Sequence, residues 1–312
     1  MKYQKIKLKN NNKLSTPILF LIFNRPDVTH RVFKSIKEAK PQRLYIAADG
    51  PFSNNKYEEK LCYESRQIIK EIDWDCELKT LFRKENLGCK IAVSEAIKWF
   101  FDQEKEGIIL EDDCLPSQSF FWFCQDLLEH YRYEHQIGAI CGFYSNEKDY
   151  SPNTSYFISR YLRVWGWAGW RRTFEDYESN INSLIKKNNS WRENIFSSND
   201  FLLKKYWQDM FDKVSCEQIN TWDAQLQYLL WQKNQNVLIP SKNLIKNIGW
   251  ERGTHSQNKD HNHDLSISEI RFPIDHLEIL NRDIVADKFI EKKSYRITKF
   301  AFLKKYLKKM IK

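Results

Sequence analysis

The segment 107–114 (GIILEDDC) is the feature that most constrains how this chain can fold. Three apolar residues are followed at once by the acids Glu111, Asp112 and Asp113, which is typical of a buried strand that carries carboxylates at its C-terminal end. Open α/β sheets bind ligands at that edge. Three adjacent carboxylates repel one another unless a cation or hydrogen-bond donors lie among them. The segment therefore predicts a divalent-metal site for a diphosphate, with an acidic helix-capping loop as the alternative.

The first part of the chain alternates apolar, strand-like segments with segments of helical periodicity. Strands are expected at 17–23, 43–48, 76–82 and 107–113, and helices at 27–39, at 57–72 and around 91–100. Four strands joined by three helices imply a parallel, doubly wound sheet with right-handed crossovers. Each of these strands is followed by polar residues, so four polar strand ends are expected on one rim of the sheet.

The second part of the chain is less regular and rich in aromatic residues. It predicts helices at 117–133 and 220–231, an interrupted helix at 174–213, and strands at 137–143 and 237–240. Between them, residues 165–170 (WGWAGW) interleave three tryptophans with two glycines. Because no internal repeat and no Gly/Pro-rich linker divides the chain, a single domain is expected.

Composition argues against several classes of protein. A hydrophobic content of 42% and an aromatic content of 15% argue against disorder. The chain has no run of about 18 apolar residues, so no transmembrane helix is expected, and its first residues lack the apolar core of a signal peptide. The seven cysteines include no Cys-x-x-Cys pair, which favours free thiols in a reducing cytoplasm.

The positive charge of the chain is concentrated at its two ends. Residues 292–312 carry nine basic side chains and no acidic one, and residues 1–13 carry five lysines. Subtracting both groups from the net charge of +9 leaves −5 for residues 14–291. No nucleic-acid partner is therefore expected for the folded body.

The C-terminal segment 292–312 combines its basic residues with apolar ones at helical spacing. The apolar positions are Phe300, Leu303, Leu307, Met310 and Ile311. This pattern predicts a basic amphipathic helix that binds an anionic membrane surface. The alternatives are a solubilising tail or a helix packed on a partner protein.

These elements, in this order, resemble the GT-A class of nucleotide-sugar glycosyltransferases, and within it the protein N-acetylglucosaminyltransferase I type. The resemblance covers roughly residues 15–260. Five segments carry it: residues 23–25 (FNR), Asp49, residues 111–113 (EDD), residues 222–223 (WD) and residues 253–257 (GTHSQ). It implies an α/β, GT-A-like (Rossmann-like) fold with a mostly parallel sheet flanked by helices.

For the cation, the resemblance implies a site at the end of the fourth strand. Residues 111–113 match the family's Glu-Asp-Asp form of the Asp-x-Asp motif, in which Asp113 would bind Mn²⁺ or Mg²⁺ directly. Glu111 and Asp112 would position the ribose or metal-bound water. His255, in residues 253–257 that match the family's closing Ser-His-x-Gln segment, would bind the metal or donate to the diphosphate, with a solvent-exposed loop histidine as the alternative.

For catalysis, the resemblance implies that Asp223 is the general base of an inverting transfer. Such a reaction needs one carboxylate on the acceptor side, within hydrogen-bonding reach of the incoming hydroxyl. Trp222 would form a platform for a sugar or raise the pKa of Asp223 by desolvation. The alternative is an ordinary helix start, since Asp and Thr favour helix N-termini.

Four further residues would contact the nucleotide. The resemblance places Arg25 near the nucleotide and Asp49 against the uracil and ribose. Asn86 and Gly88 would let the backbone approach the nucleotide closely. Each has an ordinary interpretation as well, as a surface arginine or as a turn residue.

The tryptophan-rich segment would contact the sugar. Its residues Trp165, Gly166, Trp167 and Gly169 offer aromatic faces and close backbone approach. The alternative for these tryptophans is packing in the core.

The sequence thus predicts a metal-dependent inverting glycosyltransferase. Its expected parts are a basic segment 1–14, a catalytic domain 15–290 and the tail 291–312, with the nucleotide bound by 15–115 and the acceptor by 116–290. The donor would be a nucleotide-diphosphate sugar, with a UDP-sugar favoured, and the acceptor a glycan or a lipid-linked saccharide in surface polysaccharide synthesis at the cytoplasmic side of the membrane. The alternatives are a nucleotidyltransferase and a catalytically inactive carbohydrate-binding or scaffold protein.

Overall fold

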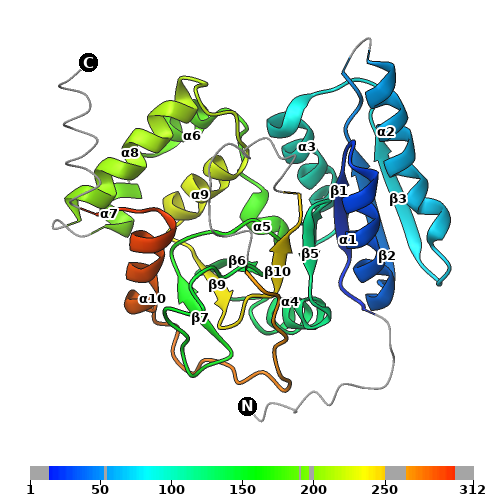
Figure 1. Cartoon of the computed structure of the whole chain (residues 1–312). Helices are drawn as coiled ribbons and strands as arrows, with labels where there is room; N and C mark the ends of the chain where they lie inside the picture. The colour runs from blue at the N-terminus through cyan, green and yellow to red at the C-terminus, as the bar shows by residue number, and fades with distance from the viewer. Residues whose placement is uncertain (1–13, 53–54, 190, 197–199, 250–264, 299–312) are drawn as a thin grey trace.

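The central strands are apolar on both faces, and this buries them between two layers of helices. The computed structural model describes residues 14–52, 55–189, 191–196, 200–249 and 265–298. Strands β1 (Ile18–Ile22), β2 (Arg43–Ala48), β3 (Glu77–Phe82) and β4 (Glu106–Glu111) run parallel in the order β3-β2-β1-β4 (Figure 1). The four strands predicted from the sequence are therefore confirmed.

The crossover helices follow the predicted periodicity. They are α1 (Pro26–Ala39), α2 (Lys56–Arg66), which continues as a 3₁₀ turn at Gln67–Glu71, and α3 (Gly88–Gln103). Alternate β1 residues face opposite sides of the sheet: Phe20 packs in the cluster that includes α1, and Leu21 in the cluster that includes α3. Helices on both faces of a largely parallel sheet define a Rossmann-like α/β fold, as the sequence predicts.

The second half of the chain extends the same sheet. Beyond β4 the order continues β8-β6-β9-β7, with β8 (Trp167–Trp170) antiparallel between β4 and β6 (Ile137–Cys141). Strand β9 (Asn236–Pro240) runs parallel to β6, and β7 (Tyr156–Ser159) is antiparallel to β9. A separate antiparallel pair joins β5 (Cys114–Pro116) to β10 (Ile245–Asn247). The sheet therefore runs continuously through both halves predicted for the catalytic domain.

Helices of the second half cover both faces of its strands. They are α4 (Gln118–His130), α5 (Arg171–Phe174), α6 (Ile181–Lys187), α7 (Trp191–Ile195), α8 (Phe201–Ser215), α9 (Asp223–Gln232) and α10 (Ile284–Phe289). Helix α4 packs in the cluster that contains α1, whereas α8 and α9 pack in the cluster that contains α3. Within the described residues, no helix combines the length and apolarity that crossing a bilayer requires.

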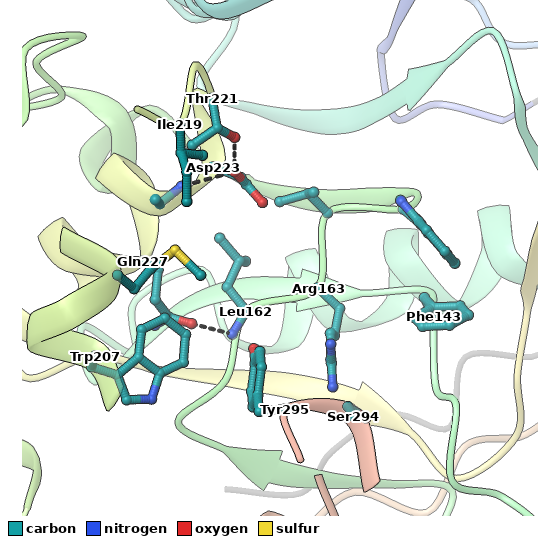
Figure 2. A pocket seen from close by; sticks show the side chains of 14 residues that line it. Phe143, Leu162, Arg163, Trp207, Ile219, Thr221, Asp223, Gln227, Ser294 and Tyr295 are labelled. Carbon is teal, nitrogen blue, oxygen red and sulfur yellow. Dashed lines mark hydrogen bonds between the residues drawn. The ribbon is translucent and has the colours of Figure 1, made fainter. Parts of the chain in front are cut away.

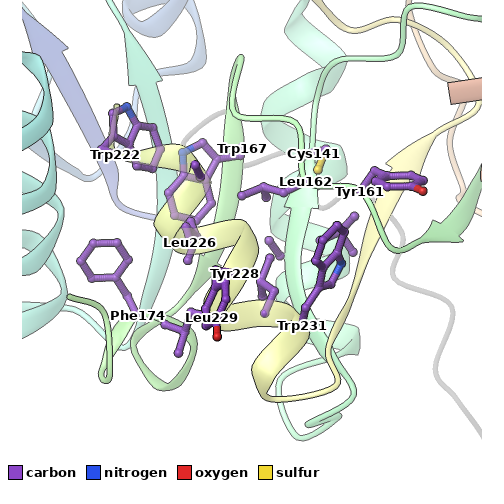
Figure 3. Close-up of a cluster of buried hydrophobic side chains, with 14 of the residues drawn as sticks. Cys141, Tyr161, Leu162, Trp167, Phe174, Trp222, Leu226, Tyr228, Leu229 and Trp231 are labelled. Atoms are coloured by element: carbon purple, nitrogen blue, oxygen red, sulfur yellow. The ribbon is translucent and has the colours of Figure 1, made fainter. Parts of the chain in front are cut away.

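Aromatic side chains fill the core beneath α9. Trp167 and Trp222 stack with ring centroids 6.1 Å apart, and Trp231 is fully buried (Figure 3). Trp167 and Gly169 lie inside the central strand β8, and the Trp167 ring is only 1% exposed. Trp167 and Gly169 therefore pack in the core and do not form an open surface for a sugar. Core packing was the alternative interpretation of the tryptophan-rich segment.

The C-terminal part of the described chain is anchored on the body. Helix α10 passes directly into a π-helical turn at Ile290–Ser294, and the Tyr295 ring lies 5.0 Å from that of Trp207. Buried Arg160 pairs with Asp287 and Glu291 of this segment at 3.5 and 3.3 Å. The predicted boundary at 290/291 therefore falls within packed structure. Residues 299–312 of the predicted amphipathic helix lie outside the described residues.

Candidate active site at the carboxyl ends of β1 and β4

The parallel pairing of β1 with β4 brings two distant segments to one edge of the sheet. Leu21 pairs with Glu111, so Arg25, just after β1, lies beside Asp112 and Asp113, just after β4. The Arg25 guanidinium pairs with Asp112 through Nη2 and with Asp113 Oδ2 through Nη1, the latter at 3.0 Å. In this structure Arg25 therefore contacts the acids of the predicted metal motif, where the sequence led us to expect a phosphate or a base.

The cluster of acids at the end of β4 carries more negative charge than Arg25 can offset. Burial, together with the nearby carboxylates of Asp113, Asp112 and Asp223, raises the pKa of Glu111 to about 8. Burial also raises the pKa of Asp112 to about 6, although Arg25 acts against this rise. With a pKa of about 8, the Glu111 carboxyl group holds its proton near neutral pH unless a further cation enters. This excess of carboxylates suits a divalent cation.

A glycine that the sequence reasoning missed lies directly against this ion pair. After β10, the backbone N–H of Ile248 donates to the Asp113 carbonyl oxygen at 2.8 Å. A Cβ added at Gly249 would lie 2.5 Å from Arg25 Nη1 and 2.5 Å from Asp113 Cβ. Only glycine fits this close backbone approach. The chain after β10 thus begins to cover the site, and residues 250–264, including His255, lie outside the described residues.

Asp49 joins the end of β2 to the start of α3. Its carboxylate accepts the backbone N–H groups of Leu87 at 3.0 and 3.1 Å and Gly88 at 3.0 Å. Asn86 Nδ2 donates to the Gly50 carbonyl oxygen at 2.8 Å, and Gly88 has φ +76°. Asp49, Asn86 and Gly88 therefore stabilise a turn, which is the ordinary interpretation of these residues from the sequence. Their contact with a nucleotide stays a prediction.

Asp223 lies at the first position of α9 and faces the same site. Its Oδ1 accepts hydrogen bonds from Thr221 Oγ1 and from the Ala224 backbone N–H, the latter at 2.9 Å. Its Oδ2 takes part in none of the hydrogen bonds found among the described residues. Trp222, beside it, is 3% exposed and packs on Trp167, so the core holds the start of α9 in place.

Electrostatic coupling places Asp223 close to the acids of β4. The Asp223 carboxylate contributes to the raised pKa of Glu111. Cys89, at the start of α3, is an exposed residue. Desolvation raises the pKa of its thiol to about 12, and the negative charges of Glu111 and Asp223 act in the same direction. The strand-end acids therefore lie within electrostatic reach of the start of α3 and of the start of α9.

A cavity of about 440 Å³ opens beside Asp223 (Figure 2). Trp165 lines it, with its ring 4.5 Å from that of Phe143. Gly166, next in the chain, has φ +60°, a conformation that favours glycine, and it turns the chain from Trp165 into β8. Of the predicted sugar-contacting tryptophans, Trp165 is thus the one that lines the cavity.

The residues present fit a cation held by few protein ligands. Among the described residues, no group of three or more His, Cys, Asp or Glu side chains is arranged to hold a metal ion. Asp113 and Glu111 nevertheless offer carboxylate oxygens at the sheet edge, and a site with one or two carboxylates leaves coordination positions for substrate phosphates. Burial and carboxylate repulsion together raise the pKa of Glu111, and a divalent cation beside these groups would offset the repulsion.

Comparison with known proteins gives matches to solved structures only. No protein-family model and no curated protein matches the chain. HddC from Yersinia pseudotuberculosis matches with a TM-score of 0.32 and 11% identity, covering 52% of this chain and 80% of that chain. HddC complexed with GMP-PN matches with a TM-score of 0.31 and 12% identity over the same shares. The 4-diphosphocytidyl-2C-methyl-D-erythritol synthase from Anaerococcus prevotii DSM 20548 matches with a TM-score of 0.31 and 10% identity, covering 62% of this chain and 84% of that chain. Likeness this low assigns no activity.

The raised pKa of Glu111 predicts a pH-dependent stability in the absence of divalent cations. Between pH 4.5 and about 8 the unfolded chain ionises this carboxyl while the folded chain keeps it protonated, so the free energy of unfolding falls as the pH rises. Glu111→Gln removes this loss and should be more stable than wild type at pH 8.5, by an amount on the order of a few kcal/mol. Urea unfolding in EDTA at pH 5 and pH 8.5 measures the difference.

The matched control is Glu38→Gln, at an exposed position of α1, which should keep the wild-type pH profile. Identical profiles for wild type and Glu111→Gln would contradict the account of the acid cluster.

Proposed function

We propose that this chain is a metal-dependent, inverting glycosyltransferase. The observation that supports this most is the position of Asp223, which couples electrostatically to Glu111 of the strand-end acids and also lines the cavity. A glycosyltransferase needs both parts: acids for the donor diphosphate and a separate carboxylate on the acceptor side.

On the donor side, Asp113 and Glu111 would hold the cation, and Asp112 would stay paired with Arg25. The cation, when bound, supplies Lewis-acid stabilisation of the departing diphosphate. Arg25 Nη1, 3.0 Å from Asp113 Oδ2, places a positive charge beside this position and can shift its contact toward a phosphate oxygen.

On the acceptor side, Thr221 and the Ala224 backbone N–H fix Asp223 through Oδ1, which leaves Oδ2 to receive a proton. The acceptor hydroxyl oxygen would form the new bond to the anomeric carbon as the bond from that carbon to the diphosphate oxygen breaks. The hydroxyl proton would pass to Asp223, and the bonding electrons would leave with the diphosphate.

We infer a UDP-sugar as the favoured donor and a glycan or lipid-linked saccharide as the acceptor, in surface polysaccharide synthesis. These inferences rest on the resemblance of the motifs and on the basic tail. The same tail leads us to infer a protein of the cytoplasm that binds the inner face of the membrane peripherally.

Nucleotidyl transfer is the second candidate. It would use the same acids at the same sheet edge, but it needs no base beside an acceptor cavity. The solved structures that match include a 4-diphosphocytidyl-2C-methyl-D-erythritol synthase and HddC with GMP-PN, and likeness this low does not favour glycosyl transfer over nucleotidyl transfer. A catalytically inactive carbohydrate-binding protein would need neither Asp113 nor Asp223.

Two substitutions separate these functions. Asp113→Asn should abolish cation-dependent binding of the nucleotide sugar and with it turnover, because the direct ligand is lost. Asp223→Asn should keep nucleotide binding and lower the rate of transfer by about 10²–10⁴-fold, the usual contribution of a general base. Calorimetric titration with UDP and Mn²⁺ measures binding, and released UDP measures turnover of UDP-sugars in the presence of saccharide acceptors.

The reaction product decides between the two enzymatic candidates. A glycosyltransferase releases nucleoside diphosphate from a nucleotide sugar, whereas a nucleotidyltransferase releases pyrophosphate from a nucleoside triphosphate and a sugar phosphate. Pyrophosphate release that survives Asp223→Asn would refute glycosyl transfer. Sugar binding unaffected by both substitutions, without turnover, would favour the inactive carbohydrate-binding protein.

Membrane binding through the basic tail gives a separate prediction. Replacing Lys304, Lys305, Lys308 and Lys309 by Gln should weaken binding to vesicles of phosphatidylglycerol by several kcal/mol, since each lysine near an anionic surface contributes about 1 kcal/mol. Co-sedimentation with these vesicles measures the effect, and phosphatidylcholine vesicles serve as the uncharged control. Equal sedimentation of both proteins with the anionic vesicles would rule out this role of the tail.

A further inference from the structure

The cavity beside Asp223 is lined by aromatic rings and by the side chain of Arg163. It lies between α8, α9 and the segment that precedes β8, and Trp165, Trp207 and Tyr295 contribute rings to its lining (Figure 2). Asp223 and Arg163 lie on different sides of it in this view. The cavity thus offers a carboxylate, a guanidinium and flat apolar faces to one bound molecule.

Arg163 is held in place by its backbone and by an aromatic ring. Its backbone N–H donates to Cys141 Sγ at 3.3 Å, and its guanidinium carbon lies 4.9 Å from the centroid of the Tyr295 ring. Cation–π contact of this kind orients a guanidinium without neutralising it. The Arg163 guanidinium is therefore held at the cavity, and the Tyr295 ring does not neutralise its positive charge.

No acidic group of the described chain pairs with Arg163. Its Nη2 atom is buried and has no hydrogen-bond partner in that part of the chain, and no ion pair of Arg163 is found there. Arg160, three residues earlier, shows the contrast, because it pairs with both Asp287 and Glu291. The Arg163 side chain as a whole is partly exposed and lines the cavity, so an anionic ligand bound there would compensate the charge of its guanidinium.

We propose that the cavity binds an acidic saccharide, a sugar that carries a carboxylate or a phosphate, as the acceptor. Its anionic group would pair with Arg163, its ring would lie against Trp165 or Tyr295, and a hydroxyl would face Asp223. This inference rests on the proposed function, because it assigns the acceptor class to the transferase site. It makes Arg163 a specificity-determining residue on the acceptor side, a role separate from that of the donor-side acids.

Saturation-transfer NMR with simple probes tests the proposal in the full-length chain. The probes are glucuronate, glucose 1-phosphate and glucose, which share a hexose ring and differ in charge. Wild type should bind at least one anionic sugar about tenfold more tightly than glucose, because a charge-assisted hydrogen bond strengthens binding by about that factor. Preference for glucuronate identifies a carboxylate as the recognised group, and preference for glucose 1-phosphate identifies a phosphate.

Arg163→Gln should remove this preference and leave glucose binding unchanged. Arg31→Gln, at an exposed position of α1, is the matched control and should retain the preference. Equal binding of all three sugars by wild type would overturn the proposal without any need for a variant. An unchanged preference in Arg163→Gln would overturn it as well.

The donor site gives an independent readout. Binding of UDP with Mn²⁺, followed by thermal shift, should be the same in wild type and in Arg163→Gln, which also verifies that the variant is folded. Failure of wild type to bind UDP with Mn²⁺ counts against the proposed function, whereas loss of the anionic preference counts against the acceptor class alone. The two failures are therefore distinguishable.

Discussion

Repulsion among the carboxylates at the end of β4 is the constraint on which the site depends. Glu111, Asp112 and Asp113 share a small volume, and Asp223 of α9 adds to their field. Arg25 offsets part of this negative charge, because the pairing of β1 with β4 brings it against Asp112 and Asp113. A single guanidinium cannot neutralise these acids, and burial together with the remaining repulsion makes Glu111 hold a proton at neutral pH. A site built this way favours the entry of a cation, and the cation in turn favours a diphosphate.

The rest of the fold keeps the two sides of this site at fixed positions. The strands carry the acids and Arg25, and the Asp49 carboxylate joins the end of β2 to the start of α3. On the opposite side, the stacked pair Trp167 and Trp222 fixes the start of α9, from which Asp223 faces the cavity. Both sides thus rest on buried, well-packed elements, which is what a reaction between two positioned substrates requires.

The sequence predicted the parts of this structure that depend on local patterns. The apolar runs of β1, β2 and β4 and the periodicity of α1 and α3 need no long-range information, and the acids after β4 follow from the same pattern. β8 was missed because it is only four residues long and Gly169 separates its two tryptophans, so that neither alternation nor a long apolar run is visible. The pairing of Arg25 with Asp113 was missed because it spans 88 residues of sequence. Arg163 and Gly249 could be recognised only from the folded chain. Arg163 stands out because no acidic side chain of the described residues pairs with it, and Gly249 because its backbone lies close to Arg25 and Asp113.

The central claim is that the acids at the end of β4 bind a cation together with a diphosphate. Electron paramagnetic resonance of free Mn²⁺ tests it most directly, because the signal of the hydrated ion falls when the ion binds to a protein. The account predicts that wild-type protein and UDP together remove much more of this signal than UDP alone or protein alone. A signal that the protein leaves unchanged, with or without UDP, would contradict it.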